Sequence, residues 1–145
     1  MKVHSQTDVG LVRTLNEDAC RTGLLGENGA WAVVCDGMGG ANGGEIASET
    51  AVKSIEEQIL ASYEEDFKSE EMKLMLSTLI FHANSAVYDM AQENESLKGM
   101  GTTIVVAIVL DNVAHIAHAG DSRAYLLHNG NIMQITTDHS MVQEL

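Results

Sequence analysis

The chain has 145 residues, of which 45% are hydrophobic, and a net charge of −13 from 21 acidic and 8 basic side chains. A protein that binds phosphate backbones needs clustered lysine and arginine, so this balance excludes a nucleic-acid partner. No apolar run reaches the roughly 20 residues of a membrane span, and no signal peptide pattern is present, so no membrane association is expected. The length suits one domain, and two cysteines in unlike settings suit the cytoplasm.

The first segment with chemical potential is residues 7–18, where Arg13 precedes the adjacent acids Glu17 and Asp18. Adjacent side chains on an extended segment point to opposite faces, so both acids line one pocket only if the backbone turns or one acts through water. Arg13 offers a planar set of donors that fits a phosphate group. The alternative is an ordinary surface ion pair between Arg13 and Glu17.

The next segment is a short apolar run that ends in one acid and several glycines. Trp31–Cys35 predicts a strand buried on both faces, followed by Asp36, Gly37 and two further glycines. Asp36 is expected to be fixed by this strand but free of strand pairing. Glycines let backbone carbonyls approach a ligand closely, and Mg²⁺ prefers such a mixture of carboxylate and carbonyl oxygens. The alternative is a tight Asp-Gly turn.

The remaining pattern predicts two helices followed by antiparallel strands, which is an α+β fold. The first helix begins near Gly44, and the second carries an apolar stripe from Met72 to Met90. Strands are expected over 102–110, 113–119, 124–127 and 132–135, with Asn129-Gly130 as a hairpin turn between the last two. Residues 142–145 have the pattern of a helix interior.

Five segments in this order carry a resemblance to a known family. They are Arg13 with Asn16-Glu17-Asp18, Asp36-Gly37-Met38-Gly39-Gly40 with Gly44-Glu45, Gly99-Met100-Gly101-Thr102-Thr103, Gly120-Asp121-Ser122-Arg123-Ala124-Tyr125, and Thr137-Asp138-His139-Ser140. Their order and spacing resemble the bacterial branch of the protein phosphatase 2C family, which are metal-dependent serine/threonine phosphatases. The resemblance runs from about residue 5 to the last residue.

The resemblance implies a particular fold and domain organisation. The expected architecture is a four-layer α-β-β-α sandwich of two antiparallel sheets flanked by helices, with metals at one edge between the sheets. Residues 1–145 would form the N-terminal portion of a single catalytic domain, with the C-terminal part missing. In the family that later part supplies two further metal-binding aspartates, so the metal site of this chain is expected to be incomplete.

The resemblance also implies metal-binding roles for several residues. The aspartate matching Asp36 bridges two Mn²⁺ or Mg²⁺ ions, and the carbonyl matching Gly37 binds one of them. The acid matching Glu17 acts near the metals, often through water, and Asp18 would support it. Asp121 matches a residue that helps to hold a third, weaker metal. These assignments come from the family.

Other roles follow from the same resemblance or from local chemistry. The family places the substrate phosphate on the arginine matching Arg13. Met38 stands where animal members carry a histidine, so a histidine general acid is unavailable at that point, and no histidine is assigned to catalysis. Cys35 lies within an apolar strand, which argues against a thiol nucleophile. Asp138 is expected to cap a following helix.

The implied activity is hydrolysis of phosphoserine and phosphothreonine on proteins by a water that two metal ions activate. The expected partners are phosphorylated proteins, including a bacterial Ser/Thr kinase and its substrates, and a cytoplasmic monomer is expected. The alternative is a non-catalytic phosphoprotein-binding or regulatory module on the same scaffold. Intact acids favour the enzyme, whereas the absent carboxylates favour a chain that is inactive alone.

Overall fold

The computed structural model describes residues 1–40, 43–64 and 67–139 of the chain. These residues form two long helices, one short 3₁₀ turn and two antiparallel sheets. In chain order the elements are β1 (Asp18–Leu25), β2 (Gly29–Met38), α1 (Gly43–Ser62), α2 (Ser69–Glu93), η1 (Glu95–Leu97), β3 (Gly101–Thr102), β4 (Ile104–Leu110), β5 (Val113–Ala119), β6 (Tyr125–His128) and β7 (Asn131–Gln134).

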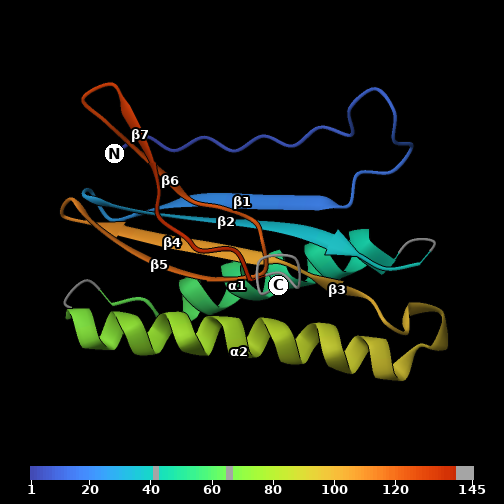
Figure 1. Cartoon of the computed structure of the whole chain (residues 1–145). Coiled ribbons are helices and arrows are strands. Elements are labelled where there is room, and N and C mark those ends of the chain that lie inside the picture. Colours follow the sequence, from blue (N-terminus) through green and yellow to red (C-terminus); the bar gives the residue numbers. More distant parts are fainter. Residues whose placement is uncertain (41–42, 65–66, 140–145) are drawn as a thin grey trace.

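The larger sheet has the order β1-β2-β4-β5, with the short β3 paired to the end of β2. Strands β6 and β7 form a separate two-stranded sheet. Figure 1 shows both helices on one side of the larger sheet and the β6–β7 hairpin on the other side. The predicted α+β fold with two antiparallel sheets is therefore confirmed.

The hydrophobic core lies between the helices and the sheet face that they cover. On α1 the fully buried Val52, Ile55 and Ile59 recur every three or four residues, which is the spacing of one helix face. On α2 the buried Met72, Met75 and Leu79 show the same spacing, and this helix packs against α1. This packing anchors β1 and β2, which carry Asp18 and Asp36.

Strand β2 differs from the sequence prediction in its burial and its length. Trp31 and Cys35 are buried against the helices, but Val34 is 47% exposed, so the strand is not buried on both faces. An apolar run cannot reveal that only one face is covered. The strand also continues to Met38, beyond the expected end at Cys35. Asp36 consequently lies inside the strand.

The later strands follow the prediction with one interruption. The strand expected over 102–110 divides at Thr103 into β3 and β4. The hairpin turn is confirmed, because Asn129 and Gly130 have φ angles of 50° and 76°, as a type I′ turn requires. The helix expected over residues 142–145 lies outside the described residues.

Within the part of the chain that the structure describes, no helix combines the length and hydrophobicity that crossing a bilayer requires.

Cys35 offers a direct check on the packing of β2. Burial raises the pKa of its thiol to about 12, whereas Cys20 on β1 is half-buried. Because the thiolate is the reactive form, we expect a thiol reagent at pH 8 to modify Cys20 first and Cys35 only after unfolding. Mass spectrometry after brief alkylation measures this order. Equal modification of both cysteines in the native state would show that β2 is not buried as described.

Candidate functional site

The backbone of Asp36 is held from both neighbouring strands. Asp36 is paired with Asp18 across β1 and β2. On the other side, the Thr103 amide donates to the Asp36 carbonyl at 2.9 Å, and the Thr102 hydroxyl donates to the same carbonyl at 3.0 Å. The Asp36 amide in turn donates to the Thr103 hydroxyl at 3.0 Å. The expectation that Asp36 is free of strand pairing was therefore wrong, because β2 continues past it.

Glu17 lies just before β1 and is packed against the start of α1. Its backbone carbonyl accepts a hydrogen bond from the Gly37 amide at 3.0 Å. A Cβ on Gly44 would lie 2.3 Å from the Glu17 Oε1 atom, so the carboxylate reaches the first turn of α1. A helix N-terminus favours negative charge, which makes this a suitable place for a carboxylate.

A turn at Asn16 brings both adjacent acids into one pocket. The Asn16 side-chain oxygen accepts a hydrogen bond from the Asp18 amide at 3.1 Å, so the chain bends immediately before β1. Glu17 and Asp18 therefore line the same pocket, as the sequence allowed only with a backbone turn. This acidic pocket has a volume of about 240 Å³ and is lined by Asp8, Val9, Arg13, Leu15, Asn16, Glu17, Asp18 and Asp36.

Arg13 stands at the acidic pocket with most of its side chain in solvent. Its Nη1 atom donates to the Glu17 Oε2 atom at 3.2 Å, and its side chain is 75% exposed against 27% for Glu17. The ion pair that was the alternative interpretation of Arg13 is thus present. An exposed pair contributes little to stability, so a phosphate group can compete for this guanidinium at small cost.

The charges around Asp36 disfavour its ionised form. Partial burial is the first cause that raises the pKa of the Asp36 carboxyl; the charges of Asp18 and Asp121, a hydrogen bond with Asp18 and the charge of Glu17 add to it. Asp121 comes from the loop between β5 and β6 and is not among the residues that line the acidic pocket. Its charge nevertheless reaches Asp36. Crowded acids of this kind are typical of functional sites.

The oxygen donors fit a hard divalent cation in type but not in number. Asp18, Asp36 and Glu17 supply carboxylates, and Mg²⁺ or Mn²⁺ prefers such ligands. Over residues 1–40, 43–64 and 67–139, however, no group of three or more His, Cys, Asp or Glu side chains is arranged to hold a metal. The described residues therefore supply oxygen donors of a suitable type, but they do not by themselves form a metal-binding group of three side chains.

Gly37 and Gly44 are required where α1 and the segment before β1 pack closely against β2. A Cβ on Gly37 would lie 1.9 Å from the Gly44 carbonyl oxygen and 2.8 Å from the Glu17 carbonyl oxygen. Gly37 is therefore needed because α1 and the segment before β1 approach β2 too closely for a side chain. The sequence singled out this glycine for its carbonyl oxygen, whereas its steric role depends on a tertiary contact that the sequence did not predict.

Asp138 makes a different contact from the expected one. Its two carboxylate oxygens accept hydrogen bonds from the Arg123 Nε atom at 2.9 and 3.1 Å. These hydrogen bonds lower the pKa of the Asp138 carboxyl. The helix that Asp138 was expected to cap lies outside the described residues. In the described part of the chain, the pair joins the segment after β7 to the loop that carries Asp121.

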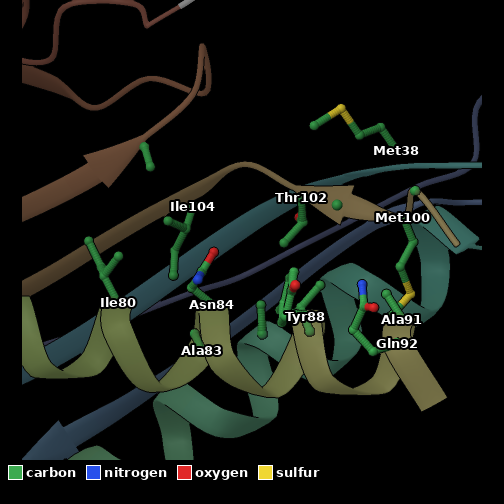
Figure 2. Close-up of a pocket in the computed structure, with 15 residues that line it drawn as sticks. Met38, Ile80, Ala83, Asn84, Tyr88, Ala91, Gln92, Met100, Thr102 and Ile104 are labelled. Atoms are coloured by element: carbon green, nitrogen blue, oxygen red, sulfur yellow. The ribbon is translucent and has the colours of Figure 1, made fainter. Parts of the chain in front are cut away.

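A second cavity, of about 420 Å³, lies between α2 and the strands β3 and β4. Figure 2 shows side chains from both elements pointing into it, among them Tyr88 and Asn84 of α2 and Thr102 of β3. The fifteen residues that line this cavity are all uncharged. This cavity therefore offers no carboxylate to a metal ion.

Some residues at the site received no role from the sequence. Thr102 and Thr103 lie within the Gly-Thr-Thr segment, yet nothing there indicated that their hydroxyls would bond to Asp36, 66 and 67 positions away. The pairing register of β2 with β3 and β4 was the missing information. The local sequence around Thr102 and Thr103 shows only two adjacent hydroxyl side chains after a glycine, which does not indicate their hydrogen-bond partner.

Comparison with known proteins identifies the family and several relatives of this chain. The protein phosphatase 2C family matches residues 12–143. The serine/threonine phosphatase stp of Listeria welshimeri is 37% identical over 148 residues, which cover all of this chain and 57% of that protein. The serine/threonine protein phosphatase PstP of Mycobacterium tuberculosis is 33% identical over 145 residues, or 26% of its length. The chain thus spans little more than half of the Listeria relative.

Solved structures agree with the fold. The crystal structure of the serine/threonine phosphatase Stp1 from Staphylococcus aureus matches with a TM-score of 0.86 and 39% identity, over 96% of this chain and 54% of that one. The catalytic domain of PstP in complex with two manganese ions matches with a TM-score of 0.78 and 34% identity, over 96% of this chain and 56% of that one. Because the family match spans nearly the whole sequence, this chain belongs to the protein phosphatase 2C family.

Proposed function

We propose that this chain is the N-terminal portion of a metal-dependent protein serine/threonine phosphatase domain. The observation that carries the proposal is the acidic pocket, where Asp36, Asp18 and Glu17 meet beside the exposed guanidinium of Arg13. The names of the relatives and the two manganese ions of the PstP complex support it. The remaining metal-binding carboxylates would come from the rest of the domain.

The proposed metal ligands are Asp36, the Gly37 carbonyl, Glu17, Asp18 and Asp121. Asp36 is the central ligand, because its neighbours place further negative charge around it. Glu17 and Asp18 complete its surroundings directly or through water, and Asp121 belongs to a weaker, third position. Two bound Mn²⁺ or Mg²⁺ ions would supply an activated water and neutralise charge on the phosphoryl group.

The protein groups then have separate tasks in the reaction. Arg13 binds two phosphate oxygens through its planar donors and orients the phosphorus atom over the acidic pocket. The hydrogen bonds of Thr102 and Thr103 fix the backbone of Asp36 within the sheet, so its carboxylate starts from a set position during the reaction. No side-chain nucleophile is needed, and the high pKa of the Cys35 thiol agrees with that.

The proposed substrates are phosphorylated proteins, including a bacterial Ser/Thr kinase and its targets, and the proposed state is a cytoplasmic monomer. The two free cysteines support a reducing compartment. The direct test measures hydrolysis of p-nitrophenyl phosphate and of a phosphothreonine peptide by the chain extended past Leu145 through the rest of the domain. We expect hydrolysis with Mn²⁺ and none with EDTA. Undiminished hydrolysis in EDTA would contradict the mechanism.

Arg13 gives a prediction that separates substrate binding from folding. We expect Arg13→Ala in the extended enzyme to lower kcat/KM by about 10 to 100-fold, mainly through KM, because a charge-assisted hydrogen bond to phosphate is worth about 1.5–3 kcal/mol. The matched control is Arg21→Ala, since Arg21 pairs with Glu49 outside the acidic pocket. Steady-state kinetics measure both. Equal effects of the two substitutions would remove Arg13 from the substrate site.

A second candidate function is a phosphoprotein-binding or regulatory module without catalysis. The observation that favours it is the lack of a three-ligand metal group among the described residues. In that case the chain binds a phosphopeptide through Arg13 with equal affinity in Mn²⁺ and in EDTA. Fluorescence anisotropy with a labelled phosphothreonine peptide distinguishes the two functions, because a metal-dependent phosphatase would bind the peptide more tightly with Mn²⁺.

A further inference from the structure

Two hydroxyl groups join the strand that carries Asp36 to the loop that carries Asp121. The Oγ1 atom of Thr103, between β3 and β4, lies 2.6 Å from the Oγ atom of Ser122, and both side chains are half-buried. Ser122 follows Asp121 directly, in the loop between β5 and β6. The hydroxyl pair thus connects two acidic residues that are 85 positions apart in the sequence.

Thr103 takes an unusual place in the ladder of the sheet. Opposite residues of an antiparallel hydrogen-bonded pair normally exchange backbone amide and carbonyl bonds. Here the Thr103 amide donates to the Asp36 carbonyl at 2.9 Å, but the Asp36 amide donates to the Thr103 side-chain hydroxyl at 3.0 Å. A hydroxyl accepts two hydrogen bonds and donates one, so the same oxygen also serves Ser122.

The loop around Asp121 is held at several of its other residues. Gly120 has a φ of +102°, and a Cβ there would lie 2.7 Å from the Thr103 Cγ2 atom, so the loop packs directly on Thr103. The Gly120 carbonyl accepts from the His139 amide at 2.9 Å. Arg123 is held by Asp138. Thr103 thus contacts the backbone of Asp36 and lies against both neighbours of Asp121, which are Gly120 and Ser122.

We propose that Thr103 is a positioning residue, whose hydroxyl sets the separation of Asp36 and Asp121 by binding the Asp36 amide and Ser122 together. The proposal rests on the proposed function in treating the two acids as metal ligands. Ligands from separate segments must be held within about 0.5 Å of their working geometry. Substituting residues that orient metal ligands typically costs about 10 to 100-fold in metal affinity.

The test compares variants that remove or keep the hydroxyl groups of Thr103 and Ser122. Thr103→Val removes the hydroxyl and keeps the shape, Thr103→Ser keeps the hydroxyl, and Ser122→Ala removes the partner. Thr78→Val is the matched control, because the Thr78 hydroxyl donates to the Leu74 carbonyl within α2. Mn²⁺ affinity of the chain is measured by electron paramagnetic resonance.

We expect Thr103→Val to bind Mn²⁺ at least about tenfold more weakly than the unmodified chain. Ser122→Ala should also weaken Mn²⁺ binding. The double variant should bind Mn²⁺ no more weakly than Thr103→Val, because both substitutions remove the same hydrogen bond between Thr103 and Ser122. Thr103→Ser and Thr78→Val should bind as the unmodified chain does. Unchanged affinity of Thr103→Val, or additive losses in the double variant, would overturn the inference.

A measurement without metal keeps the inference separate from the proposed function. The Asp36 amide should exchange with solvent at least about tenfold faster in Thr103→Val but not in Thr103→Ser, because only the valine removes its acceptor. Unchanged exchange in Thr103→Val contradicts the positioning role. If the unmodified chain and Asp36→Asn bind Mn²⁺ equally, the proposed function fails. In that case two measurements without metal decide the inference. One is the exchange of the Asp36 amide, and the other is the loss of unfolding free energy in urea for Thr103→Val, Ser122→Ala and the double variant. Additive losses of unfolding free energy would contradict the inference.

Discussion

Replacement of Asp36 by asparagine is expected to reduce phosphatase activity by at least about a hundredfold in the extended enzyme, since ligation of the metal ions contributes several kcal/mol and each 1.4 kcal/mol is a factor of ten. Asparagine keeps the shape and the backbone bonds to Thr103 but removes the negative charge. The loss should appear in kcat, because the substrate phosphate is bound through Arg13. Steady-state hydrolysis of p-nitrophenyl phosphate with saturating Mn²⁺ measures it.

The matched control for this substitution is Asp89→Asn, which changes an exposed acid on α2 outside the acidic pocket. Both substitutions change the net charge equally, so a general effect of charge on substrate attraction appears in both. We expect Asp89→Asn to retain the full rate. A similar rate for Asp36→Asn and the unmodified enzyme would exclude Asp36 as the central ligand.

Gly37→Ala is expected to destabilise the fold strongly. The added Cβ would lie 1.9 Å from the Gly44 carbonyl oxygen, where backbone rather than a flexible side chain must move. Overpacking of this kind costs about 3 kcal/mol, which corresponds to a fall in melting temperature of about 6–12 °C for a chain of this size. Thermal unfolding followed by circular dichroism measures the change.

Gly40 provides the control for Gly37. Among the described residues, no atom lies within 4 Å of a Cβ built on Gly40, and the φ of Gly40 is not positive. Gly40→Ala should therefore unfold within about 1 °C of the unmodified chain. The two substitutions add the same methyl group three residues apart. Equal melting temperatures for them would mean that α1 does not approach β2 as closely as the structure has it.

The fold was predictable because its local signals agree with one another. Hydrophobic spacing at Val52, Ile55 and Ile59 indicated α1, and Asn129-Gly130 indicated the hairpin. The burial of β2 was not predictable in the same way, since Val34 is as apolar as its neighbours and its exposure depends on which face the helices cover. Local pattern thus specifies elements, whereas coverage is a tertiary property.

The candidate site was predictable as a set of residues but not as an arrangement. Asp36, Glu17 and Asp18 were identified from the sequence, and the structure brings all three to the acidic pocket. The turn at Asn16 and the hydroxyl of Thr103 were not foreseen, because each depends on hydrogen bonds whose partners become neighbours only in the fold. That Asp36, Glu17 and Asp18 bind metal ions stays a prediction.

The crowding of acids has a consequence for the stability of the metal-free chain. The folded-state pKa of Asp36 lies above its ordinary value of 3.8, so the folded carboxyl binds a proton more tightly than the unfolded one. The stabilising effect of this proton is complete below the unfolded pKa and is lost as the pH rises through the folded pKa. At neutral pH without metal, Asp36→Asn should therefore unfold at a higher temperature than the unmodified chain.

The most direct measurement is the melting temperature of the unmodified chain and of Asp36→Asn at pH 7, in EDTA and in millimolar Mn²⁺. We predict that the variant is the more stable protein in EDTA, and that Mn²⁺ raises the melting temperature of the unmodified chain alone, since a ligand stabilises the state that binds it. An equal rise in both proteins, or a variant that is less stable in EDTA, would contradict the claim that these carboxylates are gathered for a divalent cation.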